Sequence, residues 1–354
     1  MKKLTKIGVS ALAGSLVATA ASAGSLSVGG TWEVTGEYVN GSGAAAYKAL
    51  SNSGNPFGSK GNLSFSGSGE TDFGTASWFM FTNDAQSGVS SHSITLDMGD
   101  MGLVGFDQGT GAFGLGTIDD KAPSAYEEAW NGTTQTNADM MDANGGSSGV
   151  FGYKNSMMGM NINVEYAPSI ASADAGDGGV GGVTTNPDGT SLNFAVSNTS
   201  LMDGLEVGAG YGETTYDLPS SNVTTGDTQS VAAYATYAVG SVTVGIQQNY
   251  TSNSVNASGV AIGANEVTNM GIAFNVNENL SISYQDLENK YLKSASAATG
   301  DVGQADVTTD VSGVQIAYTM GGATLRISDV TVDNGGGTAG NSEDRTEVSL
   351  LMAF

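Results

Sequence analysis

Apolar and polar residues alternate with a period of two along most of the chain. Residues 161–167 read N-I-N-V-E-Y-A, so Ile162, Val164 and Tyr166 share one side of an extended backbone and polar residues share the other. Successive side chains of a β-strand point to opposite faces, so this pattern predicts strands with one apolar and one polar face. The same pattern recurs at 192–196, 205–211, 242–246, 270–276, 280–284, 314–318 and 348–354.

The connections between these segments alternate in length. Short turns are expected near 70–75, 99–102, 156–159, 199–204, 239–241, 277–279 and 321–322. Longer polar connections fall near 41–61, 84–90, 108–148, 168–190, 213–229, 250–265, 287–309 and 333–343. Seven turns and eight loops join about 16 strands, with both chain ends on the side of the short turns. This organisation predicts an all-β, transmembrane, antiparallel up-and-down β-barrel.

The strand count depends on a few ambiguous segments. Residues 75–81 and 103–108 do not alternate cleanly, and counts of about 14 or 18 also fit the pattern. A soluble β-sandwich would alternate as well, but domains beyond roughly 250 residues usually split. Alternation here runs from Leu26 to Phe354 without a visible boundary, and the polar faces are rich in Asn, Ser, Gln and Thr. We therefore favour a single closed barrel with a water-filled lumen, which satisfies every backbone group in a bilayer.

The N-terminus has the features of an export signal. Three lysines at positions 2, 3 and 6 precede a short apolar run over 7–20, and Ala21-Ser22-Ala23 fits the small-residue cleavage pattern. We expect residues 1–23 to be a signal peptide and residues 24–354 to be the barrel domain, so that the mature chain begins at Gly24. The run is too short for a spanning helix, which needs about 20 apolar residues.

Composition excludes several functions. The formal net charge is −24, and it becomes more negative when the three leader lysines are lost. Binding to nucleic acid requires Lys and Arg to neutralise phosphates, so a chain this acidic is not expected to bind it. Cysteine is absent, which removes disulfides and thiol catalysis. The single histidine, His92, shares a face with Ile94 and Leu96 and has no carboxylate nearby in the sequence. We expect no enzymatic activity.

Two candidate ligand sites are weak. Residues 109–114 match G-x-G-x-x-G, but no helical periodicity follows, so a dinucleotide site is rejected. Asp174, Asp177 and Asp188 in a Gly-rich stretch have the oxygen ligands that Ca²⁺ prefers, but we favour solvated loop charge as their explanation. No other cofactor is expected.

The chain resembles the general diffusion porins of Gram-negative bacteria, especially the acidic alphaproteobacterial type. The local matches are G-D-M-G at 99–102, I-D-D-K-A-P-S-A-Y-E-E at 118–128, and V-S-L-L-M-A-F at the C-terminus. The terminal Phe354 of that strand resembles the signal that outer-membrane proteins present to their assembly machinery. The resemblance implies a homotrimer in outer-membrane lipid that passes small hydrophilic solutes and ions.

The resemblance also implies where the channel narrows. In that family the third long loop folds into the lumen, and here it carries four acidic residues, with a solvated loop outside the channel as the alternative. The predicted constriction residues are Asp119, Asp120, Glu127 and Glu128, and the predicted lumen-wall residues are Glu33, Glu37, Lys154 and Arg326. The chain departs from the family in having only two arginines in the barrel, Arg326 and Arg345, and a short second loop. A strong transverse field is therefore in doubt.

The sequence thus predicts an outer-membrane porin with a cation-selective channel for passive diffusion. A substrate-selective porin is the alternative within transport. A secreted acidic β-solenoid, acting as an adhesin or surface-layer protein, belongs to another class, but solenoids show a fixed repeat that this chain lacks. A barrel-borne enzyme is a third alternative.

Overall fold

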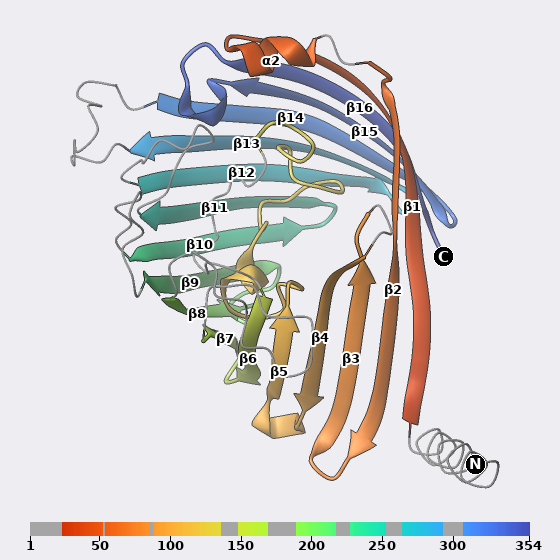
Figure 1. The fold of residues 1–354 in the computed structure, drawn as a ribbon, viewed down its shortest axis with the longest axis vertical. Helices are drawn as coiled ribbons and strands as arrows, with labels where there is room; N and C mark the ends of the chain where they lie inside the picture. Colours follow the sequence, from red (N-terminus) through yellow and green to blue (C-terminus); the bar gives the residue numbers. More distant parts are fainter. Residues whose placement is uncertain are drawn as a thin grey trace, which may run out of the picture.

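The strands form one closed antiparallel barrel in which each strand pairs with its neighbours in the sequence and β1 pairs with β16 (Figure 1). This computed structural model describes residues 23–51, 54–84, 88–135, 148–168, 189–216, 227–252, 264–292 and 307–354. The predicted count of 16 strands is confirmed. The first residues of β1 and the last residues of β16 both lie on the side of the short turns. The signal peptide and the three aspartates considered for Ca²⁺ lie outside the described residues.

The strands are β1 (Ala23–Ser42), β2 (Phe57–Thr71), β3 (Gly74–Thr82), β4 (Val89–Asp97), β5 (Leu103–Gln108), β6 (Ser148–Met157), β7 (Met160–Ala167), β8 (Gly189–Asn198), β9 (Leu205–Tyr216), β10 (Thr228–Val239), β11 (Val242–Ser252), β12 (Ala264–Asn277), β13 (Leu280–Leu292), β14 (Val307–Met320), β15 (Ala323–Asp333) and β16 (Ser342–Ala353). A short helix, α2 (Ala45–Leu50), and three 3-10 turns, η1 (Gly99–Met101), η2 (Gly114–Ile118) and η3 (Gly335–Gly337), lie in the connections. In the described part of the chain, no helix is both long and apolar enough to cross a membrane.

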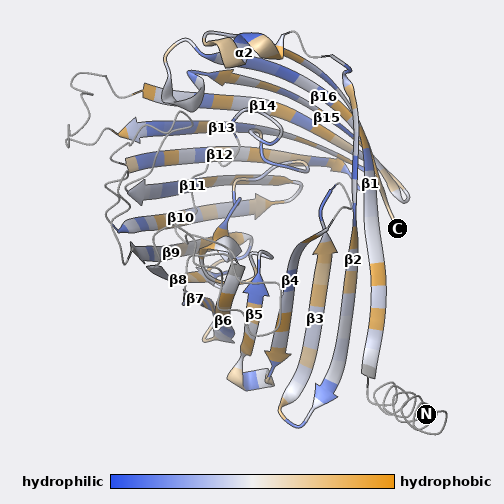
Figure 2. Ribbon diagram, in the orientation of Figure 1, coloured by the Kyte–Doolittle hydropathy of each residue, from blue (hydrophilic) through white to orange (hydrophobic). Residues whose placement is uncertain are grey.

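Hydrophilic and hydrophobic residues follow one another along the strands (Figure 2), and the two faces of the wall differ in polarity, as the alternation predicts. Outward side chains are large and apolar, such as Trp32 and Val34, which are 44% and 49% exposed. Between them on β1, Glu33 points inward and is only 4% exposed. Amides and hydroxyls dominate the buried inward positions of the later strands, among them Asn193, Gln247, Asn265, Gln285, Asn289 and Gln315.

The two segments that alternate poorly are both strands, β3 and β5. In β3 the reason is that two aromatic residues face inward: Phe79 pairs in register with Ser66 and Ser93, and its ring stacks on Phe81 at 6.2 Å. In β5 Gly105 faces inward, where the strand pairs it with Gly152. Apolar or missing side chains on the polar face thus obscure the period of two.

The seam of the barrel involves the last residue of the chain. The backbone N–H of Phe354 donates to the carbonyl of Gly30 at 2.9 Å, and the N–H of Gly30 donates to the carbonyl of Phe354 at 3.3 Å. The ring of Phe354 is 78% exposed. The terminal residue therefore continues the β1–β16 ladder while its side chain is left outside the packing of the chain.

Candidate functional site

The connection between β5 and β6 lies against the inner face of the barrel wall. We call residues 109–135, the described part of this connection, the inner loop. Its backbone N–H groups at Lys121 and Ala129 donate to the side-chain oxygens of Gln247 and Gln285 at 2.7 and 2.6 Å. The amides of Gln247 and Gln285 in turn donate to loop carbonyls of Ile118 and Ala122. Inward amides of β11 and β13 thus satisfy the backbone of a loop that has little secondary structure of its own.

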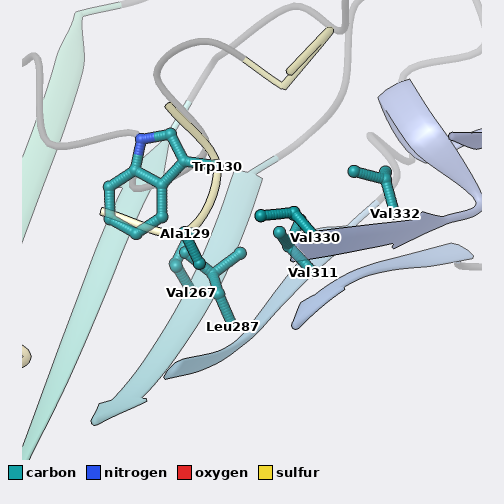
Figure 3. Packing of buried hydrophobic residues seen from close by; sticks show 7 residues of the cluster. All are labelled: Ala129, Trp130, Val267, Leu287, Val311, Val330 and Val332. Atoms are coloured by element: carbon teal, nitrogen blue, oxygen red, sulfur yellow. The ribbon is translucent and has the colours of Figure 1, made fainter. Parts of the chain in front are cut away.

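An apolar patch holds the C-terminal half of the inner loop (Figure 3). Ala129 and Trp130 pack on five aliphatic residues of the wall, and Trp130 is 6% exposed. The wall residues are Val267, Leu287, Val311, Val330 and Val332. All five occupy the inward phase of β12–β15, where the neighbouring inward positions are polar. These five residues form a local apolar patch, to which the loop binds, on an inner wall that is otherwise polar.

A second set of contacts holds the N-terminal half. The ring of Phe113 packs so closely on Gly152 of β6 that a Cβ at that position would overlap the ring. Leu115 and Ile118 pack with Ala195, Ala232 and Tyr234 of β8 and β10. Large side chains of the loop therefore meet a glycine, two alanines and one tyrosine of the wall.

The end of the inner loop is joined to two other connections. Both the N–H and the hydroxyl of Thr134 donate to Glu343 of β16, at 2.9 and 2.6 Å. The side-chain amide of Gln135 donates to the hydroxyl of Tyr47 in α2 at 2.9 Å, and its oxygen accepts from the N–H of Gly336 in η3. The first, third and last long connections are thereby linked.

A network of ion pairs, which we call the wall cluster, joins the loop to the barrel seam. Arg326 of β15 lies 3.5 Å from both Glu33 of β1 and Glu127 of the loop, and Lys60 of β2 lies 3.5 Å from Glu33. The guanidinium of Arg326 also lies 5.0 Å from the ring centroid of Tyr126. A cavity of about 320 Å³ opens beside these groups. The two positive and two negative side chains of the wall cluster balance each other.

A second charged group has an excess of carboxylates. Arg345 of β16 pairs with Glu37 at 2.7 Å and with the buried Glu343 at 3.1 Å. Glu347, two residues further on the same inward face, stands opposite Glu37 in the β1–β16 register. This group thus has three carboxylates and one guanidinium, which pairs with two of them.

The remaining loop acids form a third group, which we call the acidic group. It consists of Asp119, Asp120 and Glu128, whose charges repel one another. Partial burial inside the barrel, followed by repulsion from Asp119 and Glu128, raises the pKa of Asp120 to about 8. Burial likewise raises the pKa of Glu128. Glu127 differs, because Lys60 and Arg326 partly offset the burial that raises its pKa.

The sequence-predicted site residues are thus distributed over several groups. The structure brings Glu33, Glu127 and Arg326 together, and it puts Glu37 with Arg345. Lys154 was expected to face the acidic loop residues, but its ammonium lies 5.2 Å from the ring centroid of Phe113, beside a different cavity. Lys60, which was not among the predicted lumen-wall residues, stands directly across from Glu33 in the β1–β2 register. Sequence reasoning had no signal for that pairing.

No metal site accompanies these carboxylates in the described ranges, where no group of three or more His, Cys, Asp or Glu side chains is arranged to hold an ion.

Solved structures of outer-membrane channels have the same fold. An anion-selective porin from Comamonas acidovorans is 14% identical with a TM-score of 0.64, and the match covers 93% of this chain and 99% of that one. The channel DcaP of Acinetobacter baumannii is 11% identical with a TM-score of 0.65, covering 94% of this chain and 98% of that one. OmpF of Salmonella typhi is 14% identical with a TM-score of 0.62, covering 93% and 97%.

No curated protein sequence matches the chain. The Gram-negative porin family matches residues 8–353, nearly the whole sequence. Together with the closed barrel and the polar lumen, this match shows that the chain belongs to the Gram-negative porin family of the bacterial outer membrane.

Proposed function

We propose that the barrel is a passive, cation-selective diffusion channel for small hydrophilic solutes, with its constriction at the inner loop. The observation that carries the proposal is the seating of residues 113–135 on the inward face, held by hydrogen bonds and two apolar contacts. A loop fixed in this way narrows an aqueous lumen without closing the barrel. Passive diffusion requires no catalytic group.

The charge balance along this route supports the preference for cations. The wall cluster is neutral, whereas the group around Arg345 and the acidic group carry an excess of carboxylates. A narrow channel with low-dielectric walls focuses such a potential and raises the local concentration of cations. The solved anion-selective neighbour is only 14% identical, so selectivity is argued from this chain's own residues.

We expect the preference for cations to increase as pH rises through about 8. Because the pKa of Asp120 is raised from 3.8 to about 8, this carboxyl is largely protonated at neutral pH and gains its charge above it. The measurement is the reversal potential in a KCl gradient at pH values between 7 and 9. Asp120→Asn should abolish the step, while Asp72→Asn, in the exposed β2–β3 turn, should leave it intact. A step that persists in Asp120→Asn would contradict the assignment.

The same pKa shift affects the stability of the loop. A folded-state pKa above the ordinary value means that the seated loop favours the protonated form, so its contribution is present at low pH and is lost as pH rises through about 8. Asp120→Asn should therefore also suppress any rise in current noise at alkaline pH.

We further propose a homotrimer, assembled through the flank at the barrel seam. Outward side chains on β1 and β16, including Trp32, Val34 and Leu350, are 41–49% exposed and offer a continuous apolar surface. We expect a detergent-resistant oligomer that dissociates on heating, observed by mild electrophoresis. Val34→Lys should weaken it, whereas Val276→Lys, on β12 four strands away from β16, should not. Monomer alone in the unheated wild type would count against the proposal.

Reconstitution into a planar bilayer tests the channel itself. Stepwise current increases on insertion, together with swelling of liposomes in small sugars, are expected. Strong preference for one solute in the swelling assay would favour a substrate-selective porin instead. Absence of both signals would refute the channel.

A further inference from the structure

A second polar cavity, of about 550 Å³, lies on the other side of the inner loop from the wall cluster. It is lined by the β4–β5 turn, the ends of β6–β9 near their short turns, Tyr234 of β10, and loop residues Thr117 and Lys121. The proposed route for ions does not account for the side chains that face it. We call it the lysine cavity, because Lys121 and Lys154 both line it.

The two lysines of this cavity are held by aromatic rings. The ammonium of Lys121 lies 5.6 Å from the ring centroid of Tyr234, and that of Lys154 lies 5.2 Å from that of Phe113. Within the described residues, neither is within ion-pair distance of a carboxylate, unlike Lys60, Arg326 and Arg345. An ammonium over a ring keeps its remaining N–H groups available to a ligand.

Each strand that flanks Lys154 carries a buried carboxylate that is already engaged, Asp107 on β5 and Glu165 on β7, and Glu165 accepts a hydrogen bond from the side-chain amide of Asn193 at 2.9 Å. Asp107 is 1% exposed, and its two oxygens accept hydrogen bonds from Thr110 and from the backbone N–H of Ala112. Amide side chains of Asn155, Asn161 and Asn163 add further polar groups to the cavity wall. This side of the cavity is therefore suited to a carboxylate supplied by a solute.

Carboxylates line another part of the same cavity. Asp97 pairs with Leu103, and Leu103 pairs with Lys154, so Asp97 and Lys154 face inward two strands apart. Neighbouring strands are separated by about 4.8 Å, which puts their Cα atoms about 10 Å apart. Asp100 extends this negative side into the β4–β5 turn. Glu206 also lines the cavity, but it lies on β9, on the other side of Lys154 in the strand order, and its carboxylate accepts a hydrogen bond from the hydroxyl of Tyr234 at 2.6 Å. Side chains of opposite charge thus line the same cavity without forming ion pairs with each other.

We propose that the lysine cavity binds short zwitterionic solutes, such as amino acids with separated charges or dipeptides. The solute carboxylate contacts Lys121 and Lys154, and its ammonium contacts the acidic side formed by Asp97 and Asp100. A zwitterion has no net charge and so is not repelled by the acidic lumen, unlike a simple anion. This inference rests on the proposed channel and specifies one class of its solutes.

The test is block of the K⁺ current through single wild-type channels by a matched set of four-carbon probes. γ-Aminobutyrate carries both charges, butyrate lacks the ammonium, and butylammonium lacks the carboxylate. We expect γ-aminobutyrate to cause brief, concentration-dependent blocks. Each single-charge probe should need at least about tenfold higher concentration, because a hydrogen bond to a charged group is lost.

Variants assign the block to the lysines. Lys154→Met and Lys121→Met should each weaken the γ-aminobutyrate block about tenfold, while Lys154→Arg should retain most of it. Lys290→Met, at an exposed outward position of β13, is the matched control and should change nothing. Equal block by butyrate or butylammonium, or unchanged block in both Met variants, would overturn the proposal. Insertion steps without any block would refute this inference alone, whereas absence of steps would refute the channel as well.

Discussion

Trp130→Ala is expected to increase single-channel conductance and to add slow current fluctuations. Trp130 is 6% exposed, and it covers the aliphatic patch of β12–β15 that holds the inner loop. Truncating a buried Trp to Ala typically costs about 3–5 kcal/mol. If that cost applies to the seating of the loop, the population of displaced loops rises by roughly two to three and a half powers of ten, since about 1.4 kcal/mol is tenfold.

The matched control for Trp130→Ala is an aromatic residue on the outer face of the same wall. Phe274→Ala removes an outward aromatic of β12 that is 42% exposed and does not touch the loop, so conductance and noise should remain those of the wild type. Unchanged conductance in Trp130→Ala would mean that the loop does not limit the channel. A matched loss of folded barrel in both variants would indicate a general effect on stability.

Neutralising the four acidic residues of the inner loop is expected to have the largest effect on selectivity. The variant is Asp119→Asn, Asp120→Asn, Glu127→Gln and Glu128→Gln. In a tenfold KCl gradient the ideal limit for a monovalent ion is about 59 mV. We expect the variant to lose at least about half of the wild-type reversal potential at low salt, because charge near the constriction is little screened.

The single changes should not contribute equally to that loss. At pH 7 Asp120→Asn should have little effect, because its raised pKa of about 8 leaves it largely uncharged. Glu127→Gln should have a larger effect on the reversal potential, since it leaves Arg326 with one carboxylate partner in place of two. Replacing Asp174, Asp177 and Asp188, which lie outside the described residues, by Asn is the control and should shift the potential less. An unchanged potential in the fourfold variant would put the inner loop outside the conduction path.

The barrel could be predicted from the sequence because its two determinants are local. Alternation sets the face of each side chain, and the lengths of the connections set the order of the strands. In β3 the inward Phe79 and Phe81 obscure the alternation, and only the lengths of the connections on either side indicate a strand. The position of the inner loop had a readable signal as well. Val267, Leu287 and Val311 are out of phase with the outward residues of their strands and mark the wall to which the loop binds.

The partners within the site could not be predicted in the same way. Glu33 meets Lys60 through the β1–β2 register and Arg326 through closure of the barrel, and neither contact is visible along the chain. The four loop acids looked equivalent in the sequence, yet Glu127 contacts two cations while Asp120 lies among like charges. Their protonation depends on burial and neighbours that only the folded loop provides.

The reversal potential of the wild-type channel in a KCl gradient tests the central claim most directly. Single channels at pH 8.5 and low salt should show a potential of the sign that K⁺ permeation produces, and it should diminish as the salt concentration is raised. A potential near zero at low salt, or one with the sign of Cl⁻ permeation, would contradict the account.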